Sequence, residues 1–264
     1  MRIVSIHAHP DDAEILAGGT LALLAGLKHE IVIVTLSAGD CGSAAQGPDE
    51  IASIRKTESS ESAALIGADY RWGGFRDLAI FNDDPSRRAV TGLLRELRPD
   101  VVLTASPSDY LCDHEATSQL VRDACFTAPI ANYRTPAQNQ AQSSPLPAIP
   151  HLYFMDPIAQ QDRSGRRPVP DFTVDVASTI ETKRAMLAKH RSQRLWLQQQ
   201  HGMKDYLQQM EDWTRACGAA AGVLWGEGFR QYKLHPYPHD ALLQQVLSPY
   251  LAKPTARPFE RASG

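Results

Sequence analysis

Two short stretches of the sequence bring histidines and acids together at a spacing that suits metal-assisted chemistry. The first is "HPDD" at residues 9–12, directly after a run of β-branched residues, and the second ends in "DH" at residues 113–114. His9 and Asp12 lie three positions apart and can turn toward a common point, where His114 would complete a set of two histidines and one carboxylate. Such ligands suit Zn²⁺, and a catalytic zinc keeps a position open beyond three protein ligands. These residues therefore predict a zinc site.

The remaining acid of the first stretch, Asp11, is predicted to have a different role. It lies beside the predicted ligand Asp12 without being needed as a ligand itself. A free carboxylate next to a metal can accept the proton of a metal-bound water, which makes Asp11 a candidate general base. His7 alternates within the preceding apolar run, so we expect it to be packed or hydrogen-bonded, and we expect Glu14 to support the scaffold.

The elements that must position these residues are predicted by the hydrophobic pattern. Short, unalternating apolar runs separated by helical patterns are typical of a parallel sheet covered on both faces. The predicted strands are Ile3–Ile6, Ile31–Leu36, Val101–Thr104, Leu152–Met155 and Phe172–Val176, and the predicted helices are Ala13–Ala25, Pro48–Ile66, Pro85–Leu97 and Glu115–Phe126. We expect an α/β fold with a Rossmann-like, mostly parallel sheet and helices on both faces.

Both polar stretches should open onto the same edge of this sheet. In a parallel α/β sheet, ligand chemistry gathers past the carboxyl ends of the strands, at a topological switch point. Residues 9–12 follow the first predicted strand, and the polar segment 106–117 follows the strand at 101–104. The two loops are therefore expected to form one crevice.

The second half of the chain predicts a helical C-terminal section. The pattern favours one long helix over Ser178–Gln200 and a second helix around Lys204–Cys217. Residues 135–150 are rich in Pro, Gln and Ser and lack periodicity, which indicates a surface loop or lid. We expect a single domain over residues 1–250, followed by a flexible tail over 251–264.

Composition narrows the class of protein. The chain has 264 residues, 43% of them hydrophobic, and a net charge of −3. These values suit a globular protein and do not indicate binding to nucleic acid or to a membrane surface. Its four cysteines form no C-x-x-C pair, which argues against a disulfide framework and favours reduced thiols. No apolar stretch is long enough to span a bilayer, and the first residues have no signal-peptide pattern. We expect a cytoplasmic protein that acts on a small molecule.

The first polar stretch also carries a family resemblance. Residues 8–14 read "AHPDDAE", which resembles the A-H-P-D-D-E hallmark of the LmbE-like or PIG-L deacetylases, with Ala13 inserted before the Glu. That family consists of zinc-dependent hydrolases of N-acetylated sugars. In it the His and the second Asp bind zinc and the first Asp is the general base, which implies these roles for His9, Asp12 and Asp11.

Later segments are similar to further motifs of the same family. The stretches 37–42 and 54–69 resemble its R-x-x-E segment, which implies that Arg55 contacts substrate near the acetyl group. "HRSQ" at 190–193 and "WGEGFR" at 225–230 resemble its H-x-S-Q helix and closing segment, so most of residues 3–232 is covered. The resemblance implies one Zn²⁺ per chain, a small N-acetylated substrate that is a sugar derivative, and assembly into trimers or hexamers.

The second polar stretch departs from the family at one position. Where the family commonly reads H-P-D-H, residues 111–114 read "LCDH". The predicted ligand His114 is retained, but Leu111 replaces the histidine that stabilises or protonates the reaction intermediate. Leucine cannot donate a proton, so the proton for the departing amine must come from Asp11 itself or from another group. The candidates are Tyr110, His190 and Cys112.

Three residues are predicted on the substrate side, each with an alternative. Asp113 contacts substrate or orients a ligand histidine, or it caps the helix expected to begin near Glu115. Arg55 contacts substrate, or it is an exposed helix residue paired with Glu58 or Ser59. Tyr110 contacts substrate, or it is a packing aromatic.

These observations predict a zinc-dependent hydrolase that removes the acetyl group from an N-acetylated, amino sugar-type substrate and releases acetate and a free amine. Zinc at His9, Asp12 and His114 would polarise the carbonyl and lower the pKa of its water toward roughly 7, and Asp11 would take the proton. Two alternatives stay open. One is an amidohydrolase-type or polymerase-and-phosphatase-type metal barrel in which His7 and His9 both bind metal, with His114 and His151 as the plausible further ligands. The other is a degenerate member that binds a sugar or nucleotide-like ligand without turnover.

Overall fold

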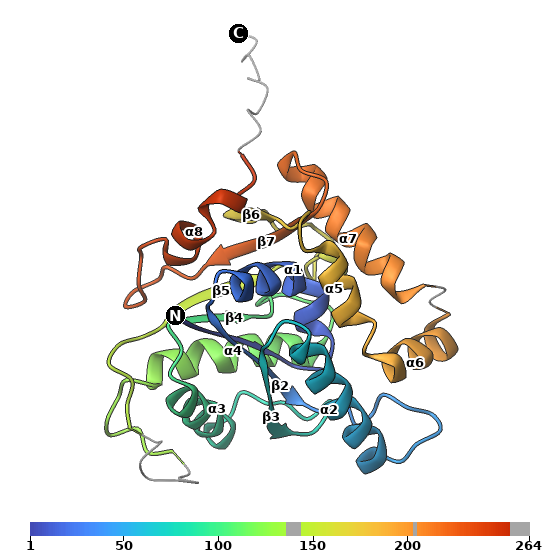
Figure 1. Cartoon of the computed structure of the whole chain (residues 1–264). Helices are drawn as coiled ribbons and strands as arrows, with labels where there is room; N and C mark the ends of the chain where they lie inside the picture. Colours follow the sequence, from blue (N-terminus) through green and yellow to red (C-terminus); the bar gives the residue numbers. More distant parts are fainter. Residues whose placement is uncertain (136–143, 203–204, 254–264) are drawn as a thin grey trace.

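The computed structural model describes residues 1–135, 144–202 and 205–253, which form a sheet with the strand order β3-β2-β1-β4-β5-β7-β6 (Figure 1). The first five strands of the chain are parallel: β1 (Arg2–His7), β2 (Glu30–Ser37), β3 (Asp69–Phe75), β4 (Val101–Thr104) and β5 (His151–Met155). β7 (Gly226–Gln231) runs antiparallel to β5 and to β6 (Phe172–Asp175). The predicted mostly parallel, Rossmann-like α/β fold is confirmed.

Helices cover both faces of the sheet (Figure 1). On one face lie α3 (Asp84–Leu97) and α4 (Cys112–Thr127), which pack against Val4 and Ile6 of β1. On the other face lie α1 (Asp12–Gly26), α2 (Pro48–Ala64) and α5 (Ile180–Leu187), where Ile3 is buried. Successive side chains of a strand point to opposite faces, so both sets of β1 side chains must be buried.

The topological switch point lies between β1 and β4. β1 continues through α1 to β2 on one side, whereas β4, on its other side, continues into α4. Loops that leave two neighbouring strands in opposite directions open a crevice past the strand ends. The fold therefore brings the loops after β1 and β4 together, as the sequence predicts.

Two strands were not predicted. β3 lies at the edge of the sheet, and its residues are exposed or half-buried, so it has no apolar run. β7 contains two glycines and the charged residues Glu227 and Arg230. These charges are paired inside the fold, Glu227 with Lys183 at 2.7 Å and Arg230 with Asp156 at 2.8 Å.

The predicted single helix over Ser178–Gln200 is wrong. The chain forms α5 and then α6 (Arg191–His201), with a break at His190, whose φ of −79° and ψ of 62° are not helical. The His190 ring is buried, and its Nε2 lies 3.0 Å from Oε1 of Glu14 in α1. This long-range contact, rather than local propensity, explains the break.

The remaining elements complete the C-terminal section. α7 (Tyr206–Ala221) corresponds to the predicted second helix and packs against α5 and α6. A short 3₁₀ helix, Ile158–Gln160, follows β5, and α8 (Leu242–Val246) and a second 3₁₀ helix, Ser248–Tyr250, follow β7. Residues 136–143 of the predicted loop and 254–264 of the predicted tail lie outside the described residues. Within the described part of the chain, no helix has the length and apolarity of a membrane span.

Candidate metal centre

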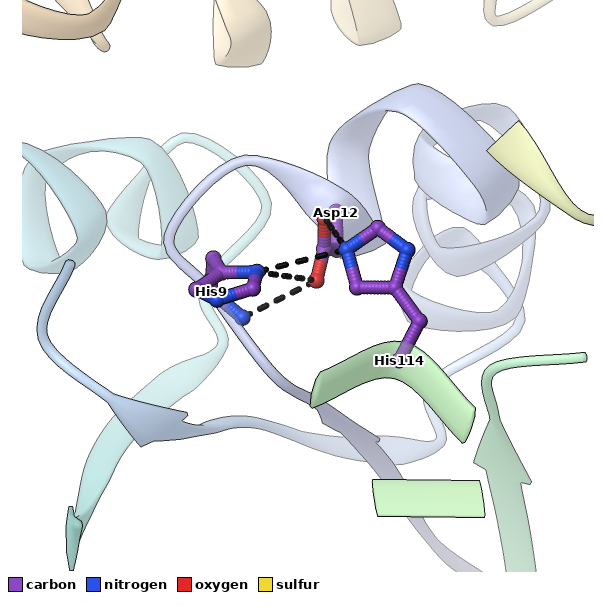
Figure 2. A group of neighbouring side chains, drawn as sticks. All are labelled: His9, Asp12 and His114. Carbon is purple, nitrogen blue, oxygen red and sulfur yellow. Dashed lines mark hydrogen bonds and ion pairs between the residues drawn. The ribbon is translucent and has the colours of Figure 1, made fainter. Parts of the chain in front are cut away.

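His9, Asp12 and His114 come together past the ends of β1 and β4 (Figure 2). His9 Nδ1 lies 3.3 Å from His114 Nε2 and 3.6 Å from Asp12 Oδ2, and Asp12 Oδ1 lies 3.5 Å from His114 Nε2. The ligands of a tetrahedral zinc ion, with bonds of about 2.0–2.1 Å, lie about 3.3 Å from one another. The spacing of the three side chains is therefore close to that of a bound set.

Carboxylates hold the ring nitrogens that face away from this point. His9 Nε2 lies 3.0 Å from Asp77 Oδ1 and 3.3 Å from Asp113 Oδ2. His114 Nδ1 lies 3.0 Å from Asp109 Oδ1. A proton on each outer nitrogen leaves the inner nitrogen with its lone pair, which is the tautomer that a metal ion requires. The donor set therefore fits a divalent metal ion.

Buried charge favours a cation at the same place. Burial lowers the pKa of His9, but hydrogen bonds to Asp113, Asp12 and Asp77 outweigh it and raise that pKa well above its usual range. Burial raises the pKa of Asp12, yet the two neighbouring histidines lower it overall. Four carboxylates thus surround two imidazoles in a region away from water. A divalent ion would balance this negative charge.

Asp11 lies beside the three predicted ligands. It is the N-cap residue of α1, with a φ of 94°, in the left-handed region that few non-glycine residues adopt. Its side chain is buried and accepts a hydrogen bond from the Tyr206 hydroxyl. Burial raises the pKa of Asp11 to about 6, although Arg55, His190 and Tyr206 favour its charged form. A strained backbone at a buried acid is typical of functional sites.

Tyr206 is a site residue that the sequence did not predict. It begins α7 and is buried against Leu187 and Met210. Burial first, and then the charge of Asp11, raise the pKa of its phenol well above the usual range, so Tyr206 remains a proton donor to the carboxylate. No local pattern indicates a contact between residues that are 195 positions apart.

Arg55 is buried, which excludes the predicted alternative of an exposed helix residue. Its Nη1 donates to the carbonyl of Gly39 at 3.2 Å and its Nη2 to the carbonyl of Pro10 at 3.1 Å. Gly39 has a φ of 66°, and a Cβ there would collide with the guanidinium group. Arg55 therefore ties α2 to the backbone just before Asp11, and it lines a cavity together with Asp11 and the predicted ligands.

Asp113 lies behind His9 rather than on the cavity wall. α4 begins at Cys112 with Leu111 as its N-cap, so the expected start near Glu115 is wrong and Asp113 is not the capping residue. The carboxylate accepts the backbone N–H of Leu78 at 2.7 Å and faces His9 Nε2. This placement favours orientation of His9 over direct contact with substrate.

A cavity of about 470 Å³ opens onto the predicted ligands and Asp11. Tyr110 and Leu111 line it, and the Tyr110 ring lies edge-on to His114, with 5.6 Å between the ring centroids. His190 is turned toward Glu14, and the Cys112 thiol toward Asp113. Of the three groups considered as substitutes for the family histidine, Tyr110 is the one that reaches the cavity.

His7 and Glu14 serve the scaffold. His7 Nε2 lies 3.0 Å from the Ser5 hydroxyl, and burial lowers the pKa of His7 to about 4. Glu14 accepts a hydrogen bond from Ser62 at 2.6 Å and pairs with His190. Among the described residues, the clusters able to hold a metal ion do not include His7, and the sheet has two free edges. The barrel alternative is therefore not supported.

The fold and the site together define an α/β protein with a centre of two histidines and one carboxylate at the sheet's switch point. Residues 4–125 match the family model described as PIG-L: GlcNAc-PI de-N-acetylase, which agrees with the resemblance that the sequence motifs indicate. The match includes His9, Asp12 and His114. Over 269 aligned residues the chain is 27% identical to 1D-myo-inositol 2-acetamido-2-deoxy-alpha-D-glucopyranoside deacetylase 1 from Saccharopolyspora erythraea, covering 84% of each chain.

Solved structures share the fold over nearly the whole chain. The 4-carboxy-2-hydroxymuconate hydratase from Pseudomonas putida has a TM-score of 0.72 and 20% identity, covering 91% of this chain and 99% of the hydratase. The N,N'-diacetylchitobiose deacetylase from Pyrococcus horikoshii has a TM-score of 0.71 and 24% identity, covering 91% of this chain and 88% of the deacetylase. A hydratase and a deacetylase therefore share one fold, and the reaction has to be argued from the site.

Proposed function

We propose that this protein is a zinc-dependent hydrolase that removes the acetyl group from an N-acetylated, amino sugar-type substrate. The observation that carries the proposal is the convergence of His9 Nδ1, Asp12 and His114 Nε2 on one point, with carboxylates on both outer ring nitrogens. These three residues would hold one Zn²⁺ per chain. The relative from Saccharopolyspora erythraea, which is named for the deacetylation of an acetamido sugar, supports the substrate class.

The residues around the predicted metal centre have separate roles in amide hydrolysis. When bound, zinc would polarise the amide carbonyl and make a water molecule acidic enough to lose a proton near neutral pH. Asp11 accepts that proton, because its buried carboxylate faces the same cavity. Tyr206 donates to Asp11 Oδ2 and fixes the carboxylate, so we assign the proton to Oδ1. Arg55 holds the Pro10 carbonyl and so the backbone that precedes Asp11.

The departing amine needs a proton that Leu111 cannot supply. Asp11, having taken a proton from the attacking water, can return it to the amide nitrogen as the C–N bond breaks. Acetate and the free amine then leave with atoms and charge balanced. Tyr110 is the second candidate donor, because it lines the cavity next to His114.

Acetate release from a panel of N-acetylated amino sugars tests the proposal. The protein is assayed as purified, after exhaustive chelation and after zinc is restored, with the metal content measured at each stage. We expect turnover that chelation abolishes and zinc restores. Saturable sugar binding without acetate release would favour the non-catalytic alternative, and turnover by fully metal-free protein would contradict the zinc assignment.

A further inference from the structure

One side of the cavity is apolar, and the proposed function does not account for it. This apolar wall consists of Leu78, Tyr110, Leu111, Ile158, Trp196 and Trp213. Its members come from the loops after β3 and β4, a 3₁₀ helix, α6 and α7. Several separate segments therefore contribute apolar side chains to one concave surface beside the predicted ligands.

Part of this wall faces water. Leu78 is 55% exposed and Tyr110 is 69% exposed, although both lie on the cavity. Large apolar side chains that stay exposed around a concave site mark a place where a ligand covers them. A ligand with an apolar group would remove this surface from water on binding.

The polar side chains of the cavity are largely engaged already. Asp77 accepts from Cys41 and pairs with His9, Asp11 accepts from Tyr206, and both terminal nitrogens of Arg55 donate to carbonyls. Among the described residues that line the cavity, the buried polar atoms without a partner are Gln193 Oε1 and Arg55 Nε. A ligand with many hydroxyl groups would leave several of them unpaired, which is costly when they are buried.

Leu111 also makes the cavity more apolar. It takes the position at which the related motif has histidine, and it adds apolar surface three residues from the predicted ligand His114. The substitution removes a polar group from the cavity and enlarges the wall. It therefore fits a change of substrate better than a simple loss of catalysis.

We infer that the substrate is an amphiphilic amide, in which an alkyl or aromatic group next to the amide bond packs on the apolar wall. This inference rests on the proposed function and specifies its substrate class. The apolar group can belong to the acyl side, as in a longer N-acyl chain, or to the amine side, as in a sugar with an alkyl aglycone. The chemistry that the wall recognises is the same in both.

Three glucosamine amides test the inference and separate the two sides. kcat/KM is measured with zinc-loaded protein for N-acetylglucosamine, octyl N-acetylglucosaminide and N-octanoylglucosamine, below the micelle concentration. Each fully buried methylene contributes about fourfold, so we expect one octyl compound to exceed N-acetylglucosamine by at least about 10-fold. Values within about twofold for all three would overturn the inference while leaving deacetylation intact. Absence of hydrolysis of all three would contradict the proposed function instead.

Variants test the apolar wall directly, and a binding measurement tests it without turnover. We expect Leu78→Ala and Trp196→Ala to lower the octyl preference by about 3- to 10-fold. The matched controls are Leu195→Ala and Trp72→Ala, which remove exposed side chains away from the cavity and should leave the preference unchanged. Saturable quenching of tryptophan fluorescence by an octyl compound would support binding of its apolar group on the apolar wall even without hydrolysis, provided that Leu78→Ala weakens this binding. Equal binding by wild-type and Leu78→Ala protein would contradict it.

Discussion

The N-terminal half of the chain and the C-terminal helices contribute to one cavity in different ways. Residues 4–125, which match the family model, supply the predicted ligands and Asp11. α6 and α7, outside that match, supply Trp196, Trp213 and Tyr206. The first part holds its polar groups in a network of buried hydrogen bonds, whereas the second presents the half-buried rings of Trp196 and Trp213 and the buried hydroxyl of Tyr206. The comparison teaches that the predicted ligands all come from the first part, whereas the apolar wall draws on both parts and Tyr206 of α7 reaches back to Asp11.

Loss of a predicted ligand should have the largest effect. His114→Ala removes one of three donors, so we expect the protein to lose zinc and activity to fall by at least about 10³-fold, because metal polarisation is worth several kcal/mol. Zinc content and acetate release are measured together. His239→Ala, which removes an exposed histidine, is the matched control. Retention of both zinc and turnover in His114→Ala would show that the chemistry lies elsewhere.

The second prediction distinguishes the proposed general base, Asp11, from the predicted metal ligands. Asp11→Asn keeps the size of the side chain but cannot take a proton, so kcat should fall by about 10²–10⁴-fold while zinc content is unchanged. Asp212→Asn, an exposed acid on α7, serves as the control. A fully active Asp11→Asn protein would rule out the assignment of Asp11 as base.

The carboxylates behind the histidines should affect metal affinity. Asp109→Asn removes the charge that faces His114 Nδ1, and loss of such a partner typically weakens metal binding by about 10- to 100-fold. Competition with a chromogenic chelator measures the affinity. Asp123→Asn, in α4 with His114 but away from the cavity, should leave the affinity unchanged. Equal affinity in both variants would mean that Asp109 does not orient His114.

The smallest effect tests the contribution of the C-terminal helices. Tyr206→Phe removes the hydroxyl that donates to Asp11, and we expect kcat to fall by about 10-fold because a hydrogen bond to a charged group is lost. KM and zinc content should not change, which a merely structural role would not predict. Tyr250→Phe, at the end of the 3₁₀ helix Ser248–Tyr250 and away from the cavity, is the control. An unchanged kcat in Tyr206→Phe would show that α7 does not contribute to catalysis through Tyr206.

Much of the fold could be predicted because burial on both faces is visible in a strand's composition. β1, β2, β4 and β5 are apolar runs, and their carboxyl ends necessarily meet at one edge. β3 is exposed at an edge, and β7 carries charges that pair with Lys183 and Asp156, which are distant in the sequence. The break before α6 depends on a contact between His190 and Glu14, which local helix propensity cannot anticipate.

The candidate site likewise contains some residues that the sequence predicts and others that it does not. His9, Asp12 and His114 could be predicted, because two strand-end motifs and the rule for parallel sheets bring them together. Asp77 and Tyr206 could not, because they reach the centre from the end of β3 and the start of α7, and their contacts depend on the paths of loops. Leu111 was visible as a departure, but its place on an apolar wall required the structure.

The position of zinc in the protein tests the central claim most directly. Anomalous diffraction at the zinc edge, from crystals of zinc-loaded protein, locates the ion without reference to activity. We predict one peak per chain, between His9 Nδ1, Asp12 and His114 Nε2. A peak on the other side of His9, between its Nε2 and the carboxylates of Asp77 and Asp113, which also lie close enough to hold an ion, would contradict the account, as would zinc-loaded crystals without a peak at either place.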